Sequence, residues 1–123
     1  MIVGLGIDLQ EIAKIARSVQ SPAFVRKVFT PAEANLCTSV HAPEGHFAGK
    51  FAAKEAFMKA LGAGIRQGIW FTDIEILNRD TGAPYAQLYR QAADIALSLG
   101  VSATHLSITH SGGMAVAAVI LEK

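Results

Sequence analysis

The segment from about residue 44 to residue 61 has the pattern of a long helix that is apolar on two opposite sides. At about 100° per residue, one broad face collects large apolar side chains and the other collects alanines. A helix of this kind is expected to be buried on both sides, and its alanine side lets another backbone come close. The large residues are Phe47, Phe51, Phe57, Met58 and Leu61, and the small ones are Ala52, Ala53, Ala56 and Ala60.

The first 40 residues predict one strand and three short helices. Residues 2–7 are apolar and include two glycines, which indicates a buried strand with a close neighbour. Apolar residues then recur at helical spacing from residue 12, so Asp8 is a candidate N-cap with Glu11 as its capping-box partner. The pairs Ser21-Pro22 and Thr30-Pro31 are typical starts of two further helices.

The second half is predicted to be mostly strand. Residues 69–77 and 84–88 form a predicted hairpin, residues 91–99 form a helix, and residues 104–110 and 114–121 form two more strands. In the strand 104–110, His105, Ser107 and Thr109 share one face. The order of elements predicts the α+β class, with a largely antiparallel sheet packed on the long central helix and a single domain over residues 1–123.

Composition adds an expected oligomer and a charge asymmetry. The chain has 123 residues, enough for one domain, and 51% of them are hydrophobic, which hints at a buried interface between subunits. The net charge is +1, but residues 1–66 hold eight of the 11 Lys and Arg residues and only five of the 10 acids. The positive half suits an acidic partner or a phosphate ligand.

Several classes of protein are not expected. The single cysteine, Cys37, excludes an internal disulfide and a cysteine-rich zinc site, and it fits a reducing compartment. The sequence shows neither a signal peptide nor an apolar run long enough to span a membrane. We therefore expect a cytoplasmic protein with neither a membrane nor a nucleic acid as its partner.

Four polar residues are candidates for one site. Asp8 and Glu55 could hold one Mg²⁺ and leave positions open for water and substrate phosphates. Lys59 could bind phosphate or donate a proton to a leaving group, and His105 could do either. Each also has a simpler interpretation: Asp8 as a helix cap, Glu55 and Lys59 as a helical ion pair, and His105 as a hydrogen-bonded sheet residue. Spacing alone does not show that the four meet.

Two motifs resemble those of a known family. Gly6-Ile7-Asp8 and the segment 51–60, which has the pattern F-x-x-K-E-A-x-x-K, are similar to the signatures of holo-acyl-carrier-protein synthases. These are the small bacterial class of 4′-phosphopantetheinyl transferases. Further similarity lies in residues 62–65, 73–76, 82–85 and 105–111, so the resemblance spans nearly the whole chain.

The resemblance implies a fold, an assembly and a reaction. Family members are α+β homotrimers with active sites between adjacent subunits. They use Mg²⁺ to transfer the 4′-phosphopantetheine group of coenzyme A to a serine of apo-acyl carrier protein, in support of fatty acid biosynthesis. By position, Asp8 and Glu55 match the metal ligands, and Glu55, Lys59 and His105 match the catalytic residues. The residues implied to bind coenzyme A are Lys50, Lys59, Gly62, His105, Thr109 and His110.

Some points stay open within this resemblance. Glu55 acting through a water, or His105, could be the base that accepts the serine proton. Lys50 stands where many members have Arg, and Ala83 stands where a Lys is common. The basic residues Lys14, Arg17 and Arg26 are expected to bind the acidic carrier protein. Two other functions remain as alternatives: a non-catalytic trimeric module that binds a nucleotide or protein, and a Mg²⁺-dependent pyrophosphate hydrolase.

Overall fold

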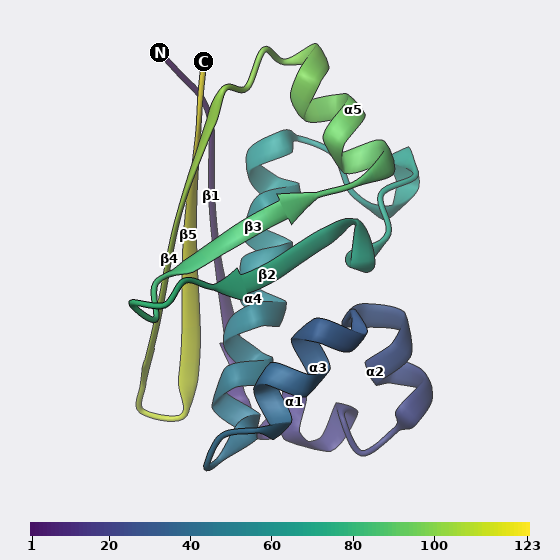
Figure 1. Ribbon diagram of the computed structural model, residues 1–123, viewed down its shortest axis with the longest axis vertical. Coiled ribbons are helices and arrows are strands. Elements are labelled where there is room, and N and C mark those ends of the chain that lie inside the picture. The colour runs from purple at the N-terminus through teal and green to yellow at the C-terminus, as the bar shows by residue number, and fades with distance from the viewer.

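The chain folds into two antiparallel sheets and five helices, which Figure 1 shows as a computed structural model describing residues 1–123. A three-stranded sheet has the order β1-β5-β4, and β2 pairs with β3 in a separate hairpin. In chain order the elements are β1 (Ile2–Glu11), α1 (Ile12–Ser18), α2 (Pro22–Val28), α3 (Pro31–Thr38), α4 (Pro43–Leu61), β2 (Ile74–Asn78), β3 (Pro84–Leu88), α5 (Arg90–Ser98), β4 (Ala103–Ser111) and β5 (Met114–Glu122). Short 3₁₀ turns cover residues 65–67 and 71–73.

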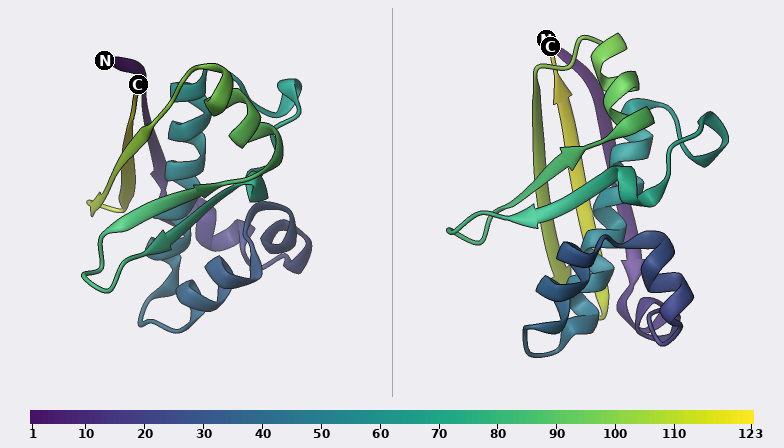
Figure 2. Two further views of the ribbon diagram at one scale, coloured as in Figure 1. Left: turned by 45° about the horizontal axis from the view of Figure 1, so that its top comes forward. Right: turned by 45° about the vertical axis from the view of Figure 1, so that its right-hand side comes forward.

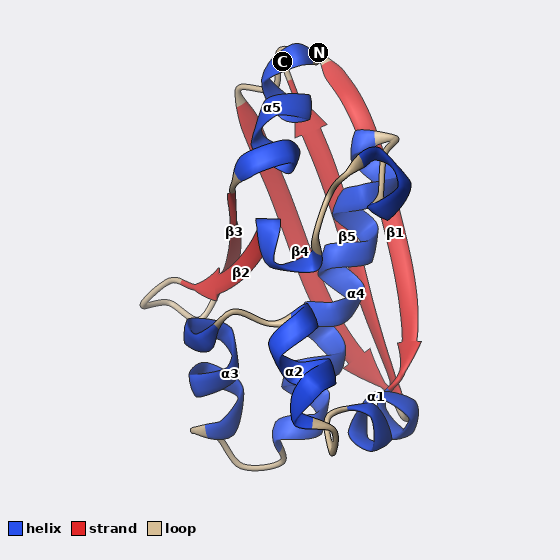
Figure 3. Cartoon of the chain, turned by 90° about the vertical axis from the view of Figure 1, so that its right-hand side faces the viewer, coloured by secondary structure: helices blue, strands red, loops and turns tan.

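Helix α4, with 19 residues, lies along one face of the three-stranded sheet. The hairpin and α5 pack on its other side, and α1, α2 and α3 surround its N-terminal half, as Figures 1 and 3 show. The hairpin crosses α4 and projects beyond the sheet (Figure 2). The opposite face of the three-stranded sheet is covered by no other element of the chain. The predicted α+β class and the antiparallel pairing are confirmed, although the strands form two sheets rather than one.

Glycines in β1 allow the sheet to approach α4 very closely. A Cβ atom on Gly6 would lie 1.8 Å from the carbonyl oxygen of Ala56, and one on Gly4 would lie 2.2 Å from that of Ala60. Only glycine fits at either position, because real Cβ atoms essentially never come within 3.0 Å of another heavy atom. The expected close neighbour of this strand is therefore α4, which meets it with its alanine side.

The large apolar residues of α4 are divided between two clusters. Phe57 and Leu61 belong to the main core, together with apolar residues of β2, β5 and α5. Phe47 belongs to a smaller cluster with buried side chains of α1, α2 and α3. Helix α4 is thus buried on both sides, as its pattern predicts.

A buried ion pair joins α3 and α4. The Lys54 ammonium lies 2.9 Å from the Glu33 carboxylate, and both side chains are 0% exposed. Lys54 also donates to the backbone carbonyls of Phe71 and Ile74, and Glu33 accepts from the N–H groups of Thr30 and Ile76. Burial lowers the pKa of Lys54, and Glu33 opposes that change. No buried side-chain polar atom of the chain lacks a hydrogen-bond partner, and this includes those of Lys54 and Glu33. The pair therefore holds α3 and β2 against α4 without leaving a buried charge unpaired.

The N-terminal caps of two helices agree with the sequence, and the predicted cap at Asp8 is wrong. Ser21 accepts from the N–H of Phe24, and Thr30 forms a complete capping box with Glu33. Asp8, however, lies inside β1 opposite Ala117, and α1 begins only at Ile12 without a side-chain cap. Backbone pairing with the long strand β5 extends as far as Glu11, so residues 8–11 remain in the strand instead of starting a helix capped by Asp8. The predicted burial of residues 2–7 is also wrong, because β1 is an edge strand and only Gly6 is buried in it.

The first strand of the hairpin is shorter than predicted. Residues 71–73 form a 3₁₀ turn in which the Asp73 carboxylate accepts the backbone N–H of Trp70 at 2.9 Å. This hydrogen bond uses a backbone N–H that would otherwise be free to pair with a neighbouring strand, so β2 starts at Ile74.

None of the helices combines the length and the apolar character that a membrane crossing requires.

Candidate functional site

Asp8 and Lys59 meet where β1 passes over the C-terminal half of α4. The Lys59 ammonium donates to the Asp8 carboxylate at 3.2 Å and to the backbone carbonyl of Ile7 at 2.9 Å. Gln10 donates to the other carboxylate oxygen of Asp8 at 2.7 Å. The Asp8 side chain is 11% exposed and that of Lys59 is 56% exposed. The cluster thus lies at the surface, where a ligand can reach it.

Glu55 completes this cluster from one turn earlier on α4. Burial raises its pKa, the nearby Asp8 charge raises it further, and Lys59 opposes both effects. Glu55 has no ion-pair partner within 4.0 Å, so the helical Glu55–Lys59 pair is not formed. The charges of Asp8 and Lys59 therefore act on Glu55, while the Lys59 ammonium forms its ion pair with Asp8 alone. The structure brings together three of the four residues expected to meet.

The donor set suits a hard divalent cation that keeps an open coordination sphere. The chain has no group of three or more His, Cys, Asp and Glu residues that could enclose a metal ion. A bound Mg²⁺ would offset the repulsion between the negative charges of Asp8 and Glu55. This ion is commonly held by one or two carboxylates together with waters and substrate phosphates. The residues present fit such an ion.

Lys50 and His110 lie together in a different hollow of about 170 Å³, between α4, β4 and the hairpin. The Lys50 ammonium is buried and donates to the Ile76 carbonyl at 2.6 Å and to the Asn78 side-chain oxygen at 3.1 Å. His46, on the first turns of α4, also lines this hollow. His46 and Asn78 could not be predicted as site residues, because neither belongs to a motif and only the fold places them beside Lys50.

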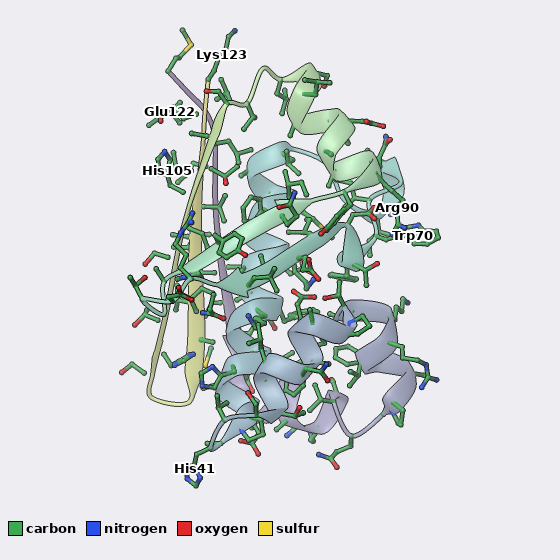
Figure 4. All side chains as sticks on the ribbon, in the orientation of Figure 1. His41, Trp70, Arg90, His105, Glu122 and Lys123 are labelled. Atoms are coloured by element: carbon green, nitrogen blue, oxygen red, sulfur yellow. The ribbon has the colours of Figure 1, made fainter.

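His105 and Thr109 lie on the uncovered face of the three-stranded sheet, away from α4. His105 Nε2 is 3.1 Å from a Glu122 carboxylate oxygen, and Figure 4 shows both side chains at the edge of the molecule beside β4 and β5. Asp8 lies opposite Ala117 and faces α4, whereas His105 lies opposite Ile120 and faces outward. Within one chain, the sheet separates His105 from the Asp8 cluster.

The remaining candidates are surface residues. Lys14 and Arg17 are exposed on α1, and Gly62, in the left-handed conformation with φ of 70°, ends α4. Arg26 and Lys27 border a hollow of about 490 Å³ that also contains the exposed Trp70. Its apolar floor and basic rim form a surface separate from the hollow at Lys50.

Comparison with known proteins decides the family. Residues 4–119 match the family model of the 4′-phosphopantetheinyl transferase superfamily. This chain belongs to that superfamily. The match includes both motifs of the sequence, and the predicted family and enzyme class are confirmed.

Members of the superfamily cover the chain from end to end. A holo-[acyl-carrier-protein] synthase of Geobacter sp. (strain M21) is 42% identical over the full length of both chains. The crystal structure of the synthase from Neisseria meningitidis is 32% identical, with a TM-score of 0.90 and complete coverage of both chains. The synthase of Helicobacter pylori in complex with coenzyme A is also 32% identical, with a TM-score of 0.84 and coverage of 96% of this chain and 99% of the other.

Proposed function

We propose that this protein is a holo-acyl-carrier-protein synthase. It transfers the 4′-phosphopantetheine group of coenzyme A to a serine of apo-acyl carrier protein and releases adenosine 3′,5′-bisphosphate. The observation that carries the proposal is the meeting of Asp8, Glu55 and Lys59 on an accessible surface in a member of the superfamily. The relatives named as synthases, and one solved with coenzyme A, support the choice of substrates.

Asp8 and Glu55 would hold Mg²⁺, which when bound offsets the negative charge of the pyrophosphate. In the reaction, the serine oxygen attacks the β-phosphorus of coenzyme A, and the bond from that phosphorus to the bridging oxygen breaks. The Lys59 ammonium donates one hydrogen bond to the carbonyl of Ile7, which holds the side chain in place. It can also donate to the departing phosphate, which it would stabilise and could protonate. The serine proton passes to Glu55 or to His105.

The two halves of the site come from different chains in this proposal. The uncovered sheet face carries exposed Leu5, Ile7 and Leu9 of β1, and His105 and Thr109 of β4 lie on the same face across β5. An apolar face of this kind favours burial against a second copy, and a homotrimer would bring His105 and Thr109 of one subunit toward a neighbouring site. Assembly thereby explains why His105 lies apart from Asp8 within one chain.

The hollow at Lys50 and His110 is proposed to take part of the nucleotide end of coenzyme A. It is too small for the whole molecule, since pockets for complete ligands of this kind measure about 300–1,000 Å³. The buried Lys50 ammonium already donates two of its three hydrogen bonds within the protein, so it would act on a phosphate mainly through its charge. Gly62 and Lys59 remain candidates for the pyrophosphate end.

The proposed cellular setting follows from the reaction. We propose that the protein acts in the cytoplasm and that its product, holo-acyl carrier protein, supports fatty acid biosynthesis. The rival functions are less well supported. A binding module has no need of the two carboxylates of Asp8 and Glu55, and a pyrophosphate hydrolase has no need of an exposed basic surface on α1.

Intact-mass measurement tests the function directly. Apo-acyl carrier protein incubated with this protein, coenzyme A and Mg²⁺ should gain the mass of one phosphopantetheine, and the gain should vanish when a chelator removes the metal. Hydrolysis of coenzyme A without a change in the mass of the carrier protein would favour the hydrolase. Binding without either change would favour the non-catalytic module.

A further inference from the structure

Two histidines face each other across the hollow that contains Lys50. The rings of His46 on α4 and His110 on β4 are 6.1 Å apart between centroids, with an interplanar angle of 69°. Gly49 makes room for this arrangement on α4. A Cβ atom on Gly49 would lie 2.9 Å from Ile108 and 3.4 Å from His110 Nε2. The close fit places the His110 ring directly against the helix that carries His46.

The charged and titratable side chains that line the hollow are all basic. Lys50 lies on the same helix one turn after His46, His110 faces it from β4, and the hairpin contributes the neutral Asn78. None of the eight residues that line the hollow is acidic. Burial lowers the pKa of His46, and the charges of His110 and Lys50 lower it further. Without a ligand, the neutral form of His46 is therefore favoured near neutral pH.

An anion in the hollow would reverse this balance. Its charge would attract a proton to His46 and would turn a neutral imidazole into a charged hydrogen-bond donor, which binds phosphate more strongly. The free energy of that protonation then depends on pH in the range where histidine titrates. The affinity should rise as the pH falls, because the bound state holds more protons than the free state.

We infer that His46 is a further substrate-binding residue, which takes up a proton when a phosphate group of coenzyme A enters the hollow. The inference rests on the proposed function, which supplies the phosphate ligand, and adds to it a residue outside both sequence motifs. It makes nucleotide binding, rather than phosphoryl transfer itself, the step that depends on the protonation of His46.

Calorimetric titration with adenosine 3′,5′-bisphosphate tests this step, in buffers that differ in ionisation enthalpy. The parent protein should take up protons on binding at about pH 6.5–7. His46→Gln should take up fewer protons and bind about threefold to tenfold more weakly at about pH 6.5, with a difference of less than about twofold at pH 8. Protonation of the ligand itself is the same for both proteins, so it cancels in the comparison.

Two further variants separate charge from structure. His46→Lys carries a charge that does not depend on pH in this range, so it should bind at about pH 8 at least as tightly as the parent and should lose the proton uptake. His41→Gln changes an exposed histidine outside the hollow and should behave like the parent (Figure 4).

Equal proton uptake and equal affinity of His46→Gln and the parent at about pH 6.5 would overturn the inference. The mass assay keeps the two proposals apart. Transfer of phosphopantetheine by the parent protein, together with unchanged proton uptake and affinity in His46→Gln, would remove only the inference. A parent protein that neither transfers nor binds the bisphosphate would count against both.

Discussion

Asp8 binds Lys59 and Gln10 rather than the start of a helix, and this changes what its replacement should do. Asp8→Asn keeps the size of the side chain and removes its charge. Transfer should fall by about a hundredfold or more, because a metal ligand contributes several kcal/mol to the transition state. The free energy of unfolding should change by less than about 1 kcal/mol, because the partner Lys59 is 56% exposed.

Glu55→Gln should give the same loss of transfer as Asp8→Asn, since the two carboxylates are proposed to share one ion. The measurements are the rate of mass gain of the carrier protein at several Mg²⁺ concentrations and urea denaturation of each variant. Glu11→Gln, at the exposed end of the same strand, is the control and should match the parent. Near-normal, Mg²⁺-dependent turnover of Asp8→Asn would show that the ligand assignment is wrong.

Two lysines of the same motif should fail in different ways. Lys54 is fully buried against Glu33, so Lys54→Met leaves a carboxylate unpaired in the core and should cost about 3–5 kcal/mol of stability. Lys59→Met removes an exposed ammonium and should leave stability nearly unchanged while transfer is lost.

Cys37 provides a measurement of this difference. Its side chain is 0% exposed, and burial raises the pKa of its thiol to about 11. A thiol reagent at neutral pH should therefore label native Lys59→Met as slowly as the parent and label Lys54→Met faster. All three proteins should react fully in denaturant. Slow labelling of a stable Lys54→Met variant would contradict the structural role of the pair.

At the scale of elements, the contact between β1 and α4 depends on a missing side chain. Gly6→Ala would place a methyl group 1.8 Å from the Ala56 carbonyl, so strand and helix must separate. We expect a loss of about 3 kcal/mol or more, together with a loss of transfer, because Asp8 follows on the displaced strand. Thermal denaturation and the mass assay are the measurements.

Gly45→Ala, on α4, is the matched control for Gly6→Ala. Its new methyl group would lie 4.0 Å from the His110 ring, an ordinary contact, and alanine favours the helical conformation. Stability should be unchanged or higher by up to about 1 kcal/mol. A Gly6→Ala protein as stable as Gly45→Ala would mean that the close approach of β1 to α4 is not needed.

The helices could be predicted from the sequence because their signals are local. The Thr30–Glu33 capping box, the Ser21 cap and the glycine after Leu61 act within a few residues of each helix end. The end of β1 could not be predicted in this way. Asp8 has the right spacing for a cap, but its fate is decided by pairing with Ala117, more than 100 residues away. The start of β2 at Ile74, later than predicted, has a local cause, which is the hydrogen bond from the Trp70 N–H to the Asp73 carboxylate.

The candidate site was predictable where one helix and one neighbouring strand carry it. Glu55 and Lys59 share a side of α4. The sequence indicated a close neighbour for β1 and, separately, for the alanine side of α4, and the structure shows that the two are each other's neighbour. The position of His105 was not predictable, since alternation along β4 gives two faces without saying which one meets α4. The burial of Lys50 depends on carbonyl and amide groups of β2, which no pattern near residue 50 reveals.

At the scale of the whole molecule, the uncovered sheet face predicts assembly. Leu5, Ile7 and Leu9 are 68%, 61% and 57% exposed on one strand. Ile7→Asp should leave a folded chain that sediments as a monomer and has lost transfer, because the charge would be buried at the subunit interface. Leu97→Asp, at a residue that is 79% exposed on α5, should remain a trimer. A fully active monomer of the parent protein at micromolar concentration would contradict the proposal.

Mixed trimers test whether one site uses two chains. Asp8→Ala and His105→Ala should each be inactive alone. When the two are unfolded together and reassembled, some interfaces should combine an intact Asp8 from one chain with an intact His105 from the next, and part of the activity should return. Mixed trimers without any transfer activity would mean that each site takes both residues from one chain, although the sheet separates them there.

The charge distribution of the molecule yields a prediction about the carrier protein. Lys14 and Arg17 are exposed on α1, which follows directly from the strand that carries Asp8. Acyl carrier proteins are strongly acidic as a class, so a basic surface here would steer the acceptor serine toward the proposed metal site. Charges at the rim of an interface act mainly on the association rate and are screened by salt. The effect of their reversal should therefore be kinetic and should depend on ionic strength.

Lys14→Glu combined with Arg17→Glu should raise the KM for the carrier protein at low salt and leave the KM for coenzyme A nearly unchanged. The parent's KM for the carrier should rise with ionic strength, and the double variant should lose most of this dependence because its attractive charges are gone. Lys123→Glu is the control, since it reverses a charge at the opposite end of the molecule from α1 (Figures 1 and 4). A double variant with an unchanged KM for the carrier protein at low salt would place the docking surface elsewhere, and the basic rim at Arg26 and Lys27 would then be the next surface to reverse.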